Sequence, residues 1–87
     1  MKVRRKHVRI FDEKGLSEFA EHLKSVRIDK GFTQEKLAYE SGLTLSQIAR
    51  IETATTNPTL STIFKIARTM KVTLPELFDF KLQKEKE

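Results

Sequence analysis

The stretch that decides the fold is TQEKLAYESGLTLSQIARIE, residues Thr33–Glu52. It holds two short runs with the apolar spacing of amphipathic helices, and the residues SGLT separate them. Helices of about ten residues are marginal in water, so two of them joined at a glycine persist only if other helices pack against them. The sequence therefore predicts a rigid helical corner that presents one helix to a partner.

Residues that start and stop helices define this corner. Thr33 can cap the first helix, and Gly42 can end it. The residues TLSQ at 44–47 match a capping box, in which Thr44 and Gln47 each bind a backbone amide of the next helix. The expected inward residues are Leu37, Ala38 and Ser41 in the first helix, and Ile48 and Ile51 in the second.

Three further helices are expected around the corner. The first, LSEFAEHLKSVRIDKG at residues 16–31, ends at a glycine. Another follows the polar loop TATTNP, with Thr59 as its cap, and the last begins at the second capping box, TLPE. The expected core residues are Leu16, Phe19, Ala20, Leu23 and Val26, then Leu60, Ile63, Phe64, Ala67 and Met70, then Leu77 and Phe78.

These patterns predict an all-α protein, a compact five-helix bundle with one domain at residues 15–80. A basic arm at residues 1–14 precedes the domain, and a charged tail at residues 81–87 follows it. The chain of 87 residues has no cysteine, which excludes disulfide scaffolds and thiolate metal sites and favours a reducing cytoplasm. No apolar run is long enough to span a membrane, so we expect a soluble protein.

The net charge of +5 is concentrated at the N-terminus. Residues 1–14 carry six basic and two acidic side chains, whereas residues 15–80 carry eight of each sign. Within the arm, the segment KHVRIF permits a short strand, which could pair with the same segment of a second subunit, and the alternative is an arm that is disordered until it binds DNA. In both cases it is expected to add salt-dependent affinity for DNA through Lys2, Arg4, Arg5, Lys6 and Arg9.

The outward face of the helix after SGLT has the residue types of a DNA reader. A major groove admits one helix, and Arg50 could bind guanine O6 and N7 with its planar guanidinium. Ser46 could bind a base edge or a phosphate, while Leu45 and Thr53 could contact thymine methyl groups. The residues expected to face bases are Leu45, Ser46, Ala49, Arg50 and Thr53. An ordinary solvated helix surface is the alternative.

Residues 17–80 resemble the helix-turn-helix domains of the lambda-repressor and Cro type, the Xre-like regulators. The resemblance rests on TQEKLAYESGLTLSQIARIE, on NPTLSTIFKIARTMKV and on TLPELF. It implies that Thr33, Gln34, Thr44 and Gln47 face the DNA backbone. It also implies a structural ion pair between Arg27 and Glu52.

The loop after the reading helix departs from the family pattern. Members often have a glycine two residues after the glutamate, where this chain has Ala54 in ETATTNP. A residue with a Cβ atom there predicts a different backbone path or a longer helix. Asn57, in the same loop, is the remaining residue expected to face a phosphate.

A homodimer on a pseudo-palindromic operator is expected, because one module of this size contacts too little DNA for tight binding. The residues LFDFKL suggest its interface, with Leu77, Phe78, Phe80 and Leu82 as members, unless they only close the core.

The sequence thus predicts a sequence-specific transcription regulator. One alternative is an antitoxin or co-regulator whose main partner is a protein such as a toxin, and another is a nonspecific architectural protein. No cofactor is expected. His7 and His22 lack the spacing of metal ligands, and no nucleophile or paired-acid motif is present, so we expect no enzyme.

Overall fold

The computed structural model describes residues 10–84, and this part of the chain contains the five α-helices that were predicted. It contains no strand, and most of the arm segment that could form one lies outside the described residues. The helices are α1 (Glu13–Asp29), α2 (Gln34–Ser41), α3 (Leu45–Glu52), α4 (Leu60–Met70) and α5 (Leu74–Leu77). The cap of α1 is Asp12, so the helix begins inside the range predicted as the arm. The five basic arm residues lie outside the described residues, and their roles stay predictions.

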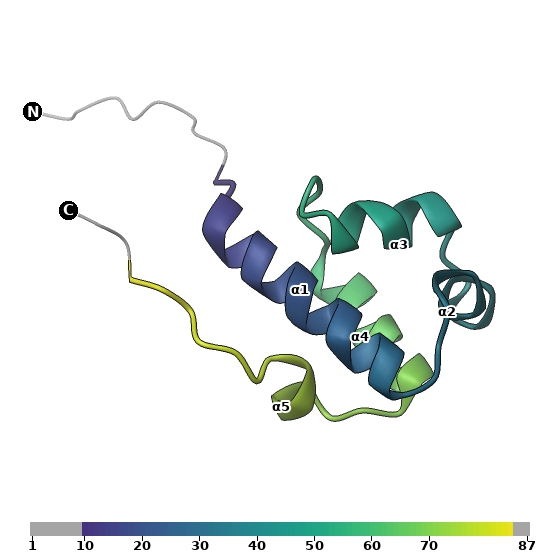
Figure 1. Ribbon diagram of the computed structural model, residues 1–87. Coiled ribbons are helices and arrows are strands. Elements are labelled where there is room, and N and C mark those ends of the chain that lie inside the picture. The colour runs from purple at the N-terminus through teal and green to yellow at the C-terminus, as the bar shows by residue number, and fades with distance from the viewer. Residues whose placement is uncertain (1–9, 85–87) are drawn as a thin grey trace, which may run out of the picture.

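α1 runs diagonally across the molecule in the view of Figure 1. α3 lies against both α1 and α2, α4 packs on α2, and α5 contacts α1 and α4. Every helix contributes one large side chain that is completely buried. These side chains are Leu23 of α1, Leu37 of α2, Ile48 of α3, Ile66 of α4 and Leu77 of α5.

Threonine caps start four of the five helices, as the sequence predicts. In each case the threonine hydroxyl oxygen accepts a hydrogen bond from the backbone N–H three residues later, which satisfies one of the unpaired amides of the first turn. The caps are Thr33, Thr44, Thr59 and Thr73. Both predicted capping boxes form, and in the second the Thr73 N–H donates to Glu76 at 2.9 Å, which lowers the pKa of this carboxyl.

Two residues predicted to be buried are instead exposed. Leu60, the first residue of α4, is 67% exposed, and Phe78, which ends α5, is 42% exposed. The buried stripe of α4 consists of Ile63, Ile66, Ala67 and Met70, and Phe64 is half-buried. The first turn of α4 has an open groove beside it, so Leu60 repeats the apolar spacing without reaching the core.

After α3 the backbone has the left-handed conformation that usually requires glycine. The prediction of a different backbone path or a longer helix at Ala54 is therefore wrong. Ala54 adopts a left-handed conformation with φ of 59°. The Ala54 N–H donates to the Ile51 carbonyl at 3.2 Å, and the Thr55 N–H donates to the Arg50 carbonyl at 3.1 Å. This pair of bonds is the Schellman motif, which ends the helix at Glu52 in spite of the Cβ atom.

The variant Ala54→Gly is expected to raise the free energy of unfolding by up to about 1 kcal/mol. The left-handed conformation costs an L-residue about 1–2 kcal/mol, and glycine avoids this cost. Part of the gain is offset because glycine loses more conformational entropy than alanine on folding. Thermal denaturation followed by circular dichroism measures the change. Ala49→Gly, in the interior of α3, is the matched control and should cost about 1 kcal/mol. Equal destabilisation by both variants would contradict the prediction.

Candidate nucleic-acid interface

The turn between α2 and α3 fixes the angle of the two helices. Gly42 has φ of 79°, a conformation that favours glycine, and its N–H donates to the Ala38 carbonyl at 3.0 Å. The buried Ser41 hydroxyl donates to the same carbonyl and accepts a bond from the Leu43 N–H, both at 3.3 Å. Thr44 then starts α3 at once, so the corner has little freedom.

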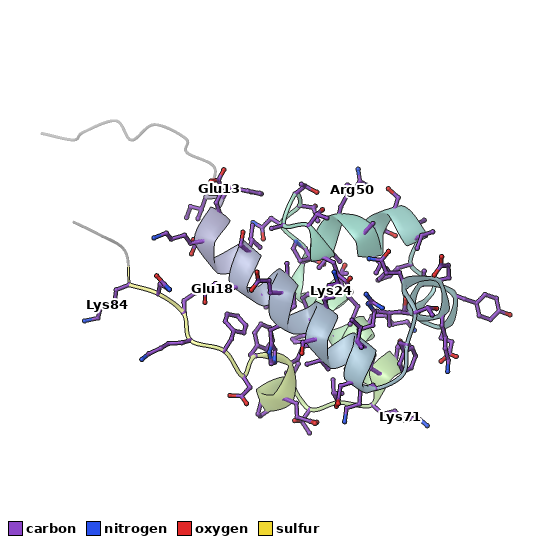
Figure 2. All side chains as sticks on the ribbon, in the orientation of Figure 1. Glu13, Glu18, Lys24, Arg50, Lys71 and Lys84 are labelled. Carbon is purple, nitrogen blue, oxygen red and sulfur yellow. The ribbon has the colours of Figure 1, made fainter. Side chains whose placement is uncertain are left out.

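α3 has one buried face and one exposed face, as predicted. Ile48 and Ile51 point into the core, with exposed fractions of 0% and 4%. On the opposite side Leu45, Ser46 and Arg50 are exposed, and Arg50 points away from the bundle (Figure 2). Two of the residues expected to face bases are less available for polar contact with DNA than Ser46 and Arg50. Ala49 is half-buried, and the Thr53 hydroxyl already donates to the Ala49 carbonyl at 3.0 Å.

An ion pair joins the helices that carry this face, and it is the pair that the resemblance implied. Arg27 Nε donates to Glu52 Oε2 at 2.6 Å, and Arg27 Nη2 donates to Glu52 Oε1 at 3.0 Å. The side chains are only 9% and 2% exposed. Arg27 Nη1 also donates to the Phe32 carbonyl at 2.8 Å, so the guanidinium connects α1, the start of α2 and the end of α3. A buried ion pair of this kind is stable only because the N–H groups of the guanidinium and both oxygens of the carboxylate are hydrogen-bonded.

Gln34 belongs to this ion-pair network, which sequence reasoning missed. Its side-chain nitrogen donates to Glu52 Oε1 at 2.9 Å, and the residue is half-buried. The other residues expected to face phosphates, Thr33, Thr44, Gln47 and Asn57, are all exposed. Gln47 uses its carbonyl oxygen in the capping box, where it accepts from the Thr44 N–H at 2.8 Å.

A hollow of about 210 Å³ brings the loop after α3 next to the reading helix. Gln47 and Arg50 of α3 line it together with Asn57 of the loop. The hollow also includes Thr59, the predicted cap of α4, and Thr62, and the sequence assigned neither of them to DNA. Hydroxyl and amide groups around a guanidinium suit the phosphodiester backbone.

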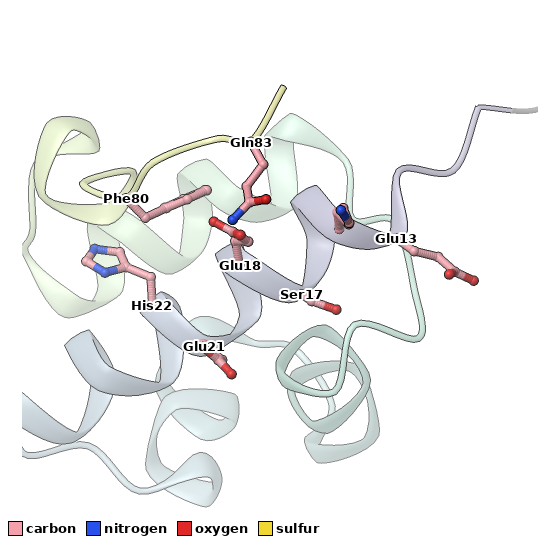
Figure 3. Close-up of a pocket in the computed structure, with 8 residues that line it drawn as sticks. Glu13, Ser17, Glu18, Glu21, His22, Phe80 and Gln83 are labelled. Carbon is pink, nitrogen blue, oxygen red and sulfur yellow. The ribbon is translucent and has the colours of Figure 1, made fainter. Parts of the chain in front are cut away.

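A larger hollow, of about 680 Å³, lies between α1 and the segment after α5 (Figure 3). Its side chains include three glutamates, Glu13, Glu18 and Glu21, against one lysine, Lys14, so it is a poor place for a phosphate. His22 has a structural role here, because its Nε2 is 2.7 Å from the Glu76 carbonyl oxygen. The α3 face is therefore the better nucleic-acid interface.

The predicted dimer residues divide into two groups. Leu77 is completely buried, so its assignment to an interface is wrong and it closes the core. Phe80 is half-buried, with its ring centre 6.2 Å from that of Phe19. Phe78 and Leu82 remain 42% and 63% exposed and so can reach a partner.

The described residues were also searched for a metal site and for a membrane-spanning helix. Between residues 10 and 84, no group of three acidic or histidine side chains is arranged to hold a metal ion. No helix in the same range has the length and apolar character needed to cross a membrane.

Comparisons of sequence identify relatives of this domain. A helix-turn-helix family model matches residues 23–77. The chain is 36% identical over 63 residues to the control protein C.BamHI of Bacillus amyloliquefaciens, which covers 71% of this chain and 78% of that protein. It is 41% identical over 51 residues to the HTH-type transcriptional regulator SlrR of Bacillus subtilis (strain 168), or 58% of this chain. The match spans only 34% of SlrR.

Solved structures with the same fold include restriction-modification controller proteins. C.AhdI from Aeromonas hydrophila superposes with a TM-score of 0.69 and 36% identity, over 72% of this chain and 96% of that one. C.Esp1396I, solved as a tetramer in complex with its natural 35-base-pair operator, superposes with a TM-score of 0.68 and 34% identity over 74% of this chain and 84% of that one. The chain therefore belongs to the helix-turn-helix family of the lambda-repressor and Cro type.

Proposed function

We propose that this protein is a transcription regulator that binds a specific, two-fold-related DNA operator as a dimer. The observation that carries the proposal is that α3 has two different faces. The face with Ile48 is buried in the core, and the face with Ser46 and Arg50 is exposed to solvent. A helix held in this way can enter a major groove without rearrangement of the bundle.

The relatives indicate what kind of regulator it is. This chain covers 78% of C.BamHI and 96% of the C.AhdI chain, so the match extends over most of two controller proteins. We infer that the protein controls transcription as they do, without catalytic activity of its own. The relatives reported above are regulators or controller proteins, which favours this role over that of an antitoxin.

Selection of bound fragments from a random DNA pool, at two salt concentrations, tests the proposal. A regulator of this type should enrich a symmetric motif, because two copies of α3 read two half-sites. Binding of all sequences with equal affinity would instead indicate the architectural alternative. Absence of any complex at low salt would overturn DNA binding altogether.

The Arg50→Ala variant is expected to weaken operator binding by about 1–3 kcal/mol and to relax selection at one base pair, because the guanidinium would lose its bonds to a guanine. Fluorescence anisotropy with the selected operator, and with versions changed at single positions, measures both effects. Lys71→Ala removes the same charge from the end of α4, far from α3, and is the control (Figure 2). If both variants weakened binding equally at every site, Arg50 would contribute only charge.

A further inference from the structure

The first described residues of the chain lie beside the loop that follows α3. Ile10 and Phe11 line a hollow of about 420 Å³ together with residues 55–57 of that loop. Asn57 also lines the hollow that contains Arg50, so the same loop borders both hollows. The chain therefore enters the domain at the end of the molecule where α3 finishes, and the start of α1 lies at that end in Figure 1.

This entry point is on the side of the molecule that carries the reading face. Ile10 is 81% exposed and Phe11 41%, so the chain before them starts at the surface. Glu13, the first residue of α1, and Arg50 lie along the same edge of the molecule in Figure 2. A chain that enters here comes from beside the end of the reading helix.

The inference rests on the proposed function for the position of the DNA. With α3 in a major groove, the loop after α3 lies against the sugar-phosphate backbone that borders this groove. The next groove across that backbone is a minor groove. Residues that precede Ile10 therefore start next to a minor groove and not next to the bases that α3 reads.

The positive charge of the chain is concentrated in the residues before this point. Residues 1–9 contain five basic side chains and no acidic one, whereas residues 15–80 carry eight of each sign. Among those eight basic side chains, Arg27 is buried in its pair with Glu52. A domain without net charge gains little from the electrostatic attraction that dominates DNA affinity, so residues 1–9 are the main source of this attraction.

We propose that residues 1–9 bind in the minor groove next to the half-site that α3 reads, where Arg4, Arg5 and Arg9 favour A·T base pairs. Nine residues span at most about 30 Å, and a minor groove is about 6 Å wide, so the segment is long enough to cross one backbone strand and follow the groove. A·T-rich DNA has a narrow minor groove with enhanced negative potential, which attracts arginine. Arginine suits this place better than lysine, because a guanidinium is more weakly hydrated than an ammonium group.

The competing arrangement is a basic segment that only neutralises phosphates. Phosphate contacts carry no sequence information, so this arrangement would add the same affinity on every flanking sequence. It would also work equally well with lysine in place of arginine. Dependence on the flanking base pairs and on arginine therefore distinguishes the minor groove from the backbone.

Binding of the full chain to operators with three kinds of flank tests the proposal. The operator obtained by selection is flanked by A·T, by G·C or by inosine·cytosine pairs, and fluorescence anisotropy gives each dissociation constant. The A·T flank should bind about tenfold more tightly than the G·C flank. Inosine lacks the N2 amino group that guanine places in the minor groove, but it keeps the major-groove acceptors O6 and N7. The inosine flank should therefore behave like the A·T flank.

Replacing arginine by lysine separates groove recognition from charge. The triple variant Arg4→Lys, Arg5→Lys and Arg9→Lys should keep the salt dependence of the parent but lose its preference for the A·T flank. These positions precede Asp12, the cap of α1, so thermal denaturation should give the midpoint of the parent. The control, Lys81→Ala with Lys84→Ala, removes two charges after α5 and should leave the flank preference unchanged.

A cleavage experiment locates the segment without relying on affinity. The chain has no cysteine, so the variant Lys2→Cys can carry a single iron–EDTA group. Radicals released in a minor groove cut the two strands at positions offset toward their 3′ ends, whereas release in a major groove gives an offset toward the 5′ ends. We expect the 3′ offset, beside each half-site.

Four results would overturn the inference. They are equal affinity for all three flanks, an inosine flank that behaves like G·C, a lysine variant that keeps the full flank preference, and cleavage offset toward the 5′ ends. Each is compatible with a symmetric selected motif, so the proposed function would stand. Absence of a complex with any duplex would instead sink the proposed function, and the inference with it.

Discussion

Replacing Glu52 by glutamine is expected to lower the free energy of unfolding by about 3–5 kcal/mol, because it leaves the buried Arg27 guanidinium without a counter-charge. Glu52 accepts three hydrogen bonds, two from Arg27 and one from Gln34. Glutamine cannot accept all three, and its amide nitrogen would face another donor. For a domain of this size the loss is a large share of the total stability.

Urea denaturation measures this effect, and a double-mutant cycle shows its origin. Arg27→Met combined with Glu52→Gln should recover part of the loss, since the pair then buries no unpaired charge. If the double variant were as unstable as the sum of the single variants, the ion pair would not be the cause. Glu35→Gln is a suitable control for glutamate replacement, because Glu35 is exposed at the start of α2.

Ile48→Ala is expected to destabilise the protein by about 2–5 kcal/mol. Ile48 is completely buried where α3 meets the core, so truncation leaves a cavity as well as removing apolar contact. Denaturation of the purified variant without DNA measures the loss. Because the reading face depends on this anchor, operator affinity should fall at temperatures where the variant begins to unfold.

Leu45→Ala is the control on the same helix. Leu45 is 44% exposed on the opposite face, so the same kind of truncation should cost less than about 1 kcal/mol of stability. Its effect should appear in DNA binding, since Leu45 is expected to contact thymine methyl groups. A Leu45 variant as unstable as the Ile48 variant would mean that the two faces of α3 are assigned incorrectly.

Much of this architecture is predictable because it depends on capping residues and apolar spacing within single helices. Thr44 and Gln47 form their capping box within four residues, and the apolar spacing identifies Ile48 and Ile51 as inward. The Arg27–Glu52 pair joins residues 25 positions apart, and it could be expected only from the family resemblance. Local signals therefore place the reading face, and the resemblance adds its support.

The errors have physical causes that local patterns do not contain. Leu60 has core spacing, but whether the first turn of α4 is covered depends on where α1 and the segment after α5 lie. The bond from Gln34 to Glu52 was not predicted, because it depends on a buried carboxylate from another helix that lies within reach of the Gln34 amide. The expected phosphate contact of Gln34 stays a prediction. Ala54 shows that backbone bonds to Arg50 and Ile51 can hold a non-glycine residue in a left-handed turn.

Because each helix contributes one completely buried large side chain to the core, a fragment of the protein must include all five helices to keep the core intact. A truncation that stops before α5 removes Leu77 and opens the underside of α1 and α4 to water. Shortened versions made for fusion to another protein or for spectroscopy should therefore extend beyond Leu77, even though α5 is far from α3 and makes no part of the reading face.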